Sequence, residues 1–362
     1  MADVVYLHVG APKTGTTYVQ DRLHANRASL VDHGVHYPVG SHLDMFPPAL
    51  DLIDRRWGGQ REGVRGEWAA LASRVRRTPG TIVISQEILA AARSEQVTQA
   101  LLDLGDAEVH VVYSARDIAR QIPAEWQELV KHRNERSYRS FLKQVRTAER
   151  RDSSLWFWQV QGLPDVLNRW GQGLPAERIH VVTVPQPGAA SDELWRRCCR
   201  AFGIDPAWAP EDAARSNPSL GIDEAALVRE LNRRLKLAGL DSAAYRHVVR
   251  NVVVHQTLAQ RRDMRRVGLP PRLTEWAAEI ADEWIAWIEA SGVEVIGSVD
   301  DLRPAPTPVE AWQNPDRPKP RRLADAALEA LVAVVMEAAA HPAPEPASMP
   351  LLGRATRRLR GQ

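Results

Sequence analysis

The chain of 362 residues is long enough for one large or two ordinary domains, with a core that needs no disulfide or metal for stability. Charged residues make up 25% of it and hydrophobic residues 44%, which excludes a wholly disordered protein. The 47 basic and 45 acidic side chains give a formal net charge of +2. That balance excludes a broad basic surface for coating nucleic acid, so no nucleic-acid partner is expected.

In the first half, strand patterns alternate with helical ones. The β-branched run 4–9 ends at Gly10 as a buried strand would, and a helix is expected from Tyr18 to about Leu30. Further strands are expected at Thr81–Ser85, Glu108–Ser114 and Arg178–Val184, and helices at Glu67–Arg77, Glu95–Leu104 and Ile118–Lys131. Pro123 should kink or restart the last of these helices. The alternation predicts an α/β fold with a parallel sheet.

After Val184 the pattern becomes helical, and little strand signal remains. Amphipathic helices are expected at Asp192–Phe202, Ile222–Leu237, Ala243–Leu258 and Leu273–Ser291. We expect this helical half to pack against the sheet and close over its site. Prolines crowd the chain beyond Asp300, which predicts a linker, followed by one more helix at Ala324–Ala340 and a mobile tail over 342–362.

The cysteines and the N-terminus bear on location. Cys198 and Cys199 are adjacent and lack the C-x-x-C spacing of redox or zinc sites, so both should be buried and unpaired. The N-terminal MADVVYLHVG has no basic segment of a signal peptide, and no stretch approaches the roughly 20 apolar residues that span a bilayer. We therefore expect a cytoplasmic protein with no membrane partner.

One loop carries most of the functional signal: Gly10-Ala-Pro-Lys-Thr-Gly-Thr-Thr17, between the first strand and the first helix. Backbone N–H groups and the positive end of the helix meet there, which makes an anion site. The glycine spacing matches the phosphate-binding pattern G-x-x-x-x-G-K-[ST], but Thr16 stands where that pattern has lysine, and Lys13 lies three residues earlier. This displacement argues against a nucleotide kinase or other NTPase of the P-loop type.

The segment Pro12-Lys-Thr-Gly-Thr-Thr17 resembles the phosphosulfate-binding loop, P-K-[ST]-G-T-[TS], of sulfotransferases that use 3′-phosphoadenosine 5′-phosphosulfate (PAPS). The resemblance implies that Pro12, Lys13, Thr14, Gly15, Thr16 and Thr17 bind the 5′-phosphosulfate. Lys13 would stabilise the bridging oxygen of the leaving group, and the chemistry requires no metal.

A second segment resembles the part of the same family that binds the 3′-phosphate, in which a strand is followed by R-[DN]-P and a serine eight residues after the arginine. Arg116 falls on the family's arginine, and its guanidinium suits a bidentate phosphate contact. Ile118 replaces the usual proline and Ala124 the usual serine, so a second phosphate contact is missing unless Arg120 or Gln121 supplies it.

The resemblance implies a P-loop-like three-layer α/β/α fold with a central parallel sheet and a helix-rich C-terminal half. We expect one sulfotransferase-like domain over 1–300, with its sheet core over about 1–205 and its helical part over about 206–300. The linker, short helix and tail described above would then occupy 301–362.

The catalytic base is predicted to be Glu87, at the end of the second strand, because active-site side chains in open α/β sheets gather at the carboxyl ends of strands. Glycan-type and bacterial members of the family are similar in placing a glutamate after that strand, where partial burial would raise its pKa. The alternative is an acid that only stabilises a helix N-terminus.

The sulfate acceptor is expected to be a hydroxyl or amine of a small molecule or glycan. Trp126, His132 and Trp57 are candidates for lining its pocket, with plain packing as the alternative for the two tryptophans. A nucleotide-binding or partner-binding module without catalysis is a further possibility if Ala124 has weakened cofactor binding. The sequence identifies neither the acceptor nor the oligomeric state.

Overall fold

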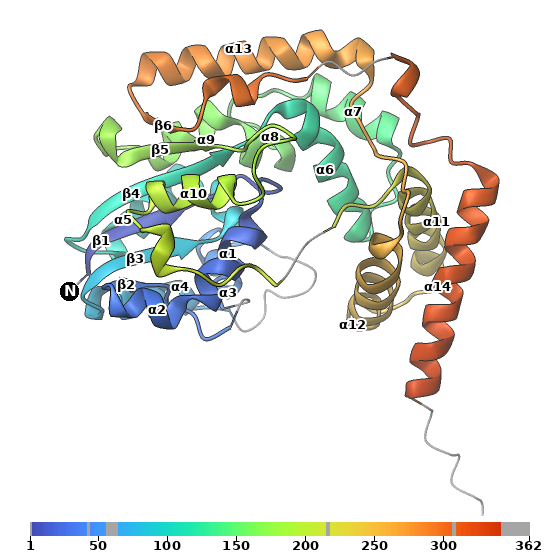
Figure 1. The fold of residues 1–362 in the computed structure, drawn as a ribbon, viewed down its shortest axis with the longest axis horizontal. Helices are drawn as coiled ribbons and strands as arrows, with labels where there is room; N and C mark the ends of the chain where they lie inside the picture. The colour runs from blue at the N-terminus through green and yellow to red at the C-terminus, as the bar shows by residue number, and fades with distance from the viewer. Residues whose placement is uncertain (1, 42–43, 56–63, 215–217, 306–308, 342–362) are drawn as a thin grey trace, which may run out of the picture.

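The computed structural model describes residues 2–41, 44–55, 64–214, 218–305 and 309–341. Its centre is a sheet of six parallel strands in the order β2-β3-β1-β4-β5-β6 (Figure 1). The strands are β1 (Ala2–His8), β2 (Val35–His36), β3 (Gly80–Ser85), β4 (Glu108–Ala115), β5 (Ile179–Thr183) and β6 (Glu294–Ile296). The α/β fold with a central parallel sheet is therefore confirmed.

Helices surround this sheet and build a separate group at the C-terminal side. They are α1 (Thr16–Ala25), α2 (Arg27–Asp32), α3 (Phe46–Leu52), α4 (Glu67–Arg77), α5 (Ser94–Asp103), α6 (Ile118–Lys131), α7 (Tyr138–Thr147), α8 (Trp156–Gln161), α9 (Leu163–Trp170), α10 (Glu193–Ala201), α11 (Ile222–Leu237), α12 (Ser242–Ala244), α13 (Thr274–Ser291) and α14 (Pro320–Ala340). A π-helix, Tyr245–Thr257, continues α12. In Figure 1, α13 runs beside the β5–β6 end of the sheet, whereas α11, α12 and α14 stand together on the other side of α6.

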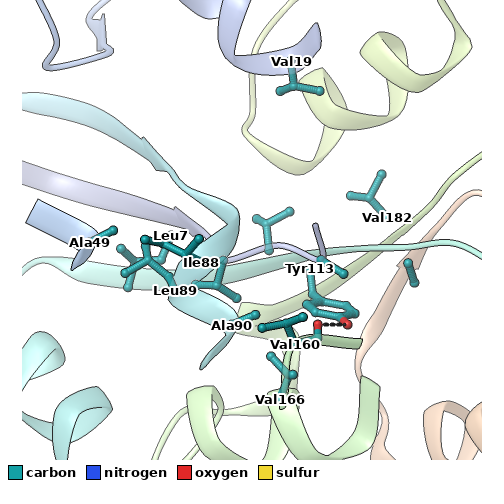
Figure 2. Packing of buried hydrophobic residues seen from close by; sticks show 14 of the residues in the cluster. Leu7, Val19, Ala49, Ile88, Leu89, Ala90, Tyr113, Val160, Val166 and Val182 are labelled. Atoms are coloured by element: carbon teal, nitrogen blue, oxygen red, sulfur yellow. Dashed lines mark hydrogen bonds between the residues drawn. The ribbon is translucent and has the colours of Figure 1, made fainter. Parts of the chain in front are cut away.

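Both faces of the sheet are covered by apolar side chains. Val5 and Leu7 of β1 are wholly buried, as expected for a parallel strand with helices on both sides. Figure 2 shows Val19 of α1 on one side of the strands and Val166 of α9 on the other. The hydroxyl of Tyr113 in β4 donates to the carbonyl of Val160 at 2.9 Å and so remains bonded inside this core (Figure 2). The arrangement is consistent with three layers, helices on either side of the sheet.

Two expected helices differ from the observed ones. The helix expected from Tyr18 to Leu30 is divided into α1 and α2 at Asn26, whose side-chain amide donates to the carbonyls of Arg22 and Glu211, both at 2.8 Å. The contact with Glu211 comes from a distant segment, which no local pattern reports. The restart expected at Pro123 is wrong, since α6 runs unbroken from Ile118 to Lys131.

The second half is rich in helices, as expected, but it also supplies a strand that the sequence analysis did not predict. β6 pairs in parallel with β5, with Glu294 opposite His180 and Ile296 opposite Val182, so a strand from the C-terminal half completes the sheet. Three residues are too few to show a period-2 pattern, which is why the sequence did not reveal this strand. The sheet core therefore extends beyond the expected boundary near 205.

The last described helix, α14, begins at Pro320, earlier than expected. Ala326 and Ala330 are its buried residues, and it packs on α11 and on the π-helix. The expected tail, 342–362, lies outside the described residues. The prediction for Cys198 and Cys199 is confirmed, because both are unpaired and buried on α10.

Candidate active site

The loops after β1, β3 and β4 meet at one edge of the sheet. His8, at the end of β1, pairs with Ser85 of β3 and with Val112 of β4 in the parallel ladders. Its Nδ1 is hydrogen-bonded to Ser85 Oγ at 2.8 Å and its Nε2 to Ser114 Oγ at 2.9 Å. Burial lowers the pKa of His8 to about 4, so the ring is neutral at pH 7 and ties three strands together beneath the loop.

The loop itself turns sharply before α1. Lys13 has φ 66° and Gly15 has φ 91°, both left-handed. The hydroxyl of Thr14 donates to the carbonyl of Ala11 at 2.6 Å, and the N–H of Ala11 donates to the carbonyl of Ser114 at 2.9 Å. The turn is therefore fastened to β4, while the first turn of α1 contains no acidic residue to neutralise its positive end.

Arg116, the predicted phosphate ligand, lies against this loop. Its Nη1 donates to the carbonyl of Lys13 at 3.1 Å. Its Nε is buried and has no hydrogen-bond partner among the described residues. Burial first, and the neighbouring charge of Arg120 second, lower the pKa of Arg116 to about 10, which leaves it charged at pH 7. Arg116 thus brings one anchoring bond and one unused donor to the loop.

Arg120 and Gln121, named above as possible replacements for the missing serine, both donate to backbone carbonyls. The Nη1 of Arg120 donates to the carbonyl of Pro185 at 3.0 Å, and Nε2 of Gln121 donates to the carbonyl of Pro12 at 2.5 Å. Both side chains therefore hold backbone segments around the site. Ala124 lies on α6 without a polar group of its own.

The amine of Lys13 forms an ion pair with a residue that the sequence did not single out. Its Nζ lies 2.5 Å from Oε2 of Glu128 on α6, and the two side chains are 18% and 17% exposed. Glu128 also accepts from His132 at 3.0 Å and has Arg250, from the π-helix, at 3.7 Å. Although burial opposes ionisation, Lys13 and His132, together with Lys131, hold the pKa of Glu128 well below its usual range.

A second acid of α6, Glu125, is 4% exposed and accepts from Nε2 of Gln161 at 2.9 Å. Burial raises the pKa of Glu125 to about 7, and the charge of Lys13 offsets part of that rise. Glu125 and Glu128 are three residues apart on a helix and therefore face the same way. Two glutamates three residues apart, on the helix that follows Arg116, were the sequence signal that could have indicated these two acids as site residues.

Glu87, the predicted base, opens a 3₁₀ turn, Glu87–Ala91, at the end of β3. Its Oε2 accepts from Nε2 of Gln20 on α1 at 3.0 Å. Its charge contributes slightly to the raised pKa of Glu125, so the two carboxyl groups are near enough to interact electrostatically.

The candidates for the acceptor pocket fall in three different places. Trp126 is only 1% exposed, its indole N–H donates to the carbonyl of Arg136 at 3.1 Å, and its ring packs on Tyr138 at 5.0 Å. The prediction that it lines a pocket is therefore wrong, because its ring belongs to the core. His132 contacts Glu128 beside Lys13, as described above, and Trp57 lies outside the described residues.

Other features were searched across the described residues. No group of three or more His, Cys, Asp and Glu side chains is placed to hold a metal ion there. A hollow of about 560 Å³ next to α9, lined by Arg151, Asp165 and Trp287 among others, shares no residue with the loop site. We place the site at the loop because the unpaired donors and the clustered carboxyl groups are there.

Comparison with protein-family models, curated proteins and solved structures found no match to this chain. Within the described ranges, no helix combines the length and the apolar character that a bilayer crossing requires.

Proposed function

We propose that the chain is a PAPS-dependent sulfotransferase that moves a sulfuryl group to a hydroxyl or amine of a small molecule or glycan. The observation that carries the proposal is the turn Pro12–Thr17. It passes through left-handed Gly15 into the first residues of α1, and the guanidinium of Arg116 lies against it.

The residues of this turn fit a group with several negative charges. The first N–H groups of a helix have no partner inside the helix, and here they belong to the residues that follow Gly15. Thr16 and Thr17 add hydroxyl donors, and the buried Nε of Arg116 has no protein acceptor in the described part of the chain. The loop would hold the 5′-phosphosulfate and Arg116 the 3′-phosphate, while Ala124 contributes no second contact.

In the reaction, bound PAPS supplies an activated sulfuryl group and a bisphosphate as leaving group. Lys13 stabilises the negative charge that grows on the bridging oxygen as the S–O bond breaks. Glu128, 2.5 Å from Lys13 Nζ, positions that amine. The acceptor's O–H or N–H proton passes to a carboxylate as the new bond to sulfur forms.

Two carboxyl groups compete for the role of base. Glu87 is the more exposed of the two. It lies at the end of β3, where the sequence analysis predicts the base. Glu125 is buried, and with a pKa near 7 it is half ionised at neutral pH. If Glu87 is the base, Glu87→Gln lowers the rate at every pH and Glu125→Gln does not. If Glu125 is the base, Glu125→Gln lowers the rate and removes a rise in rate centred near pH 7.

Isothermal titration calorimetry separates this proposal from the two alternatives. Adenosine 3′,5′-bisphosphate and ATP with magnesium are each titrated into the full chain. Metal-independent binding of the bisphosphate supports the sulfotransferase, and preference for ATP with magnesium supports an NTPase. Absence of binding to both leaves the non-catalytic module. If the bisphosphate binds, mass spectrometry of candidate acceptors incubated with PAPS then identifies the product by its added SO₃.

A further inference from the structure

Helix α14 exposes a row of large apolar side chains. We call this row the α14 stripe, and it consists of Leu328 (62% exposed), Leu331 (58%), Val332 (62%), Val335 (55%) and Met336 (65%). Successive members are one or three positions apart, so all five lie on one face of the helix. A solvated helix normally presents charged or polar residues on such a face.

The stripe cannot turn toward the protein, because the opposite face of α14 is fixed. Ala326 and Ala330 are buried there, and beside the stripe Arg261 forms a 2.7 Å ion pair with Glu329. Near the end of the helix, Nε2 of His247 lies 2.7 Å from Oε1 of Glu337. Figure 1 shows α14 at the margin of the molecule, beyond α11. These contacts set the rotation of α14 and leave the stripe facing outward.

The stripe is large for a feature without a function. Its five side chains expose on the order of 500 Å², within the size range of the largest apolar patch on a typical monomer, which is often functional. A stable dimer buries about 800 Å² on each partner. The stripe alone therefore supplies roughly 60% of that area.

We propose that the α14 stripe pairs with the same stripe of a second copy of this chain, antiparallel, about a two-fold axis between Leu331 and Val332. In that arrangement Leu328 lies opposite Val335, and exposed Ala324 lies opposite exposed Ala339. Large side chains meet in the pairs Leu328–Val335 and Leu331–Val332 and small ones in the pair Ala324–Ala339, whereas Met336 faces Ala327. The central pairs have the self-complementarity that a two-fold interface requires.

The charges favour another copy over a charged partner. Between Leu328 and Met336 the one charged residue is Glu329, whose half-exposed carboxylate forms an ion pair with Arg261. The five residues of the stripe carry no charge, so an identical apolar stripe matches them better than a nucleic acid or a charged peptide does.

Sedimentation velocity of the full chain over a hundredfold range of concentration tests the proposal. We expect a dimer, and we expect Leu331→Asp to shift the dissociation constant at least tenfold toward monomer. Leu237→Asp is the matched control, since Leu237 is 79% exposed at the end of α11, outside the stripe, and it should leave the dimer intact. A chain that is monomeric throughout, or a dimer that survives Leu331→Asp, overturns the proposal. Circular dichroism verifies that each variant is folded.

Disulfide capture tests the orientation. Leu328→Cys mixed with Val335→Cys should give a mixed disulfide dimer under mild oxidation, and Val332→Cys should pair with itself. The native Cys198 and Cys199 are buried and should not interfere. Efficient self-pairing of Leu328→Cys would indicate a parallel arrangement and overturn the antiparallel one.

Discussion

Helices α1 and α4 begin in nearly the same way and differ in what meets their first N–H groups. Each follows a glycine in the left-handed conformation, Gly15 with φ 91° and Gly66 with φ 86°. At α4, the carboxylate of Asp51 accepts from the N–H groups of Gly66 at 3.0 Å and Trp68 at 3.1 Å. Glu67 adds a second acid in the first turn.

At α1 the first turn holds no acid, and in the part of the chain that the structure describes no carboxylate accepts from its first N–H groups. On the loop side lie the positive charges of Lys13, which is paired with Glu128, and Arg116. A helix N-terminus favours negative charge, which the protein supplies internally at α4 and which the phosphosulfate would supply at α1 under the proposed function. A glycine at a helix start is therefore no evidence for an anion site until the local charges are known.

The largest effect is expected from removing the charge beside the α1 start. Lys13→Ala should lower sulfuryl transfer by at least about 100-fold, because charge on the leaving oxygen loses its stabilising amine, while affinity for the bisphosphate falls much less. The measurement is the rate of bisphosphate release from PAPS with an acceptor identified by mass spectrometry. Lys143→Ala, at an exposed position of α7, is the control. Near-normal turnover of Lys13→Ala would remove Lys13 from the mechanism.

The buried carboxyl group beside Lys13 should make stability depend on pH. The pKa of Glu125 is raised in the folded state to about 7 from its ordinary 4.5, so folding favours its protonated form. Its stabilising contribution is full below pH 4.5 and is lost as the pH rises through 7. Relative to Glu125→Gln, the wild type should lose about 3 kcal/mol of unfolding free energy between pH 4.5 and pH 8. Urea titrations of both proteins at several pH values measure this difference, and parallel pH dependences would contradict it.

The internal anion at α4 should matter for stability alone. Asp51→Asn weakens two charge-assisted hydrogen bonds and should lower the free energy of unfolding by about 1–2 kcal/mol. Affinity for adenosine 3′,5′-bisphosphate should not change. A loss of affinity as large as the loss of stability would show that the two helix starts are coupled, and would weaken the comparison.

The smallest effect distinguishes the two glycines. Gly15→Ala and Gly66→Ala each force alanine into the left-handed region, at a cost of about 1 kcal/mol in unfolding free energy. At Gly15 the new Cβ would also lie 2.5 Å from Cδ2 of Leu194, whereas at Gly66 nothing lies within 4 Å. Calorimetry should show weaker bisphosphate binding for Gly15→Ala only. Equal affinities in the two variants would argue that the turn at Gly15 does not touch the ligand.

Elements with a strong periodic face were predicted with the bounds that the structure has, namely Glu67–Arg77, Ile118–Lys131 and Ile222–Leu237. Each carries enough turns for its apolar positions to repeat. The failures are short or interrupted elements. β6 is three residues long, and the division between α1 and α2 depends on a hydrogen bond from Asn26 to Glu211, 185 residues away.

The candidate site shows the same contrast between local features, which the sequence predicted, and long-range contacts, which it did not. The sequence predicted the turn Pro12–Thr17 and its place between β1 and α1, because strand, loop and helix are consecutive in the chain. The ion pair of Lys13 with Glu128 joins residues 115 positions apart, and the hydrogen bond from Gln161 of α8 to Glu125 joins residues 36 positions apart. The aromatic signal misled, since Trp126 satisfies its indole N–H within the core.

What the sequence determined by itself is the alternation of strands and helices and the short turn that gathers backbone donors at one helix end, because both follow from neighbouring residues. The tertiary structure alone decided which helix N-terminus lacks a carboxylate, which acid has its pKa raised by burial and which face of α14 is exposed. Burial, and the electric field at a side chain, depend on residues brought together from distant parts of the chain, and a local pattern contains no record of them.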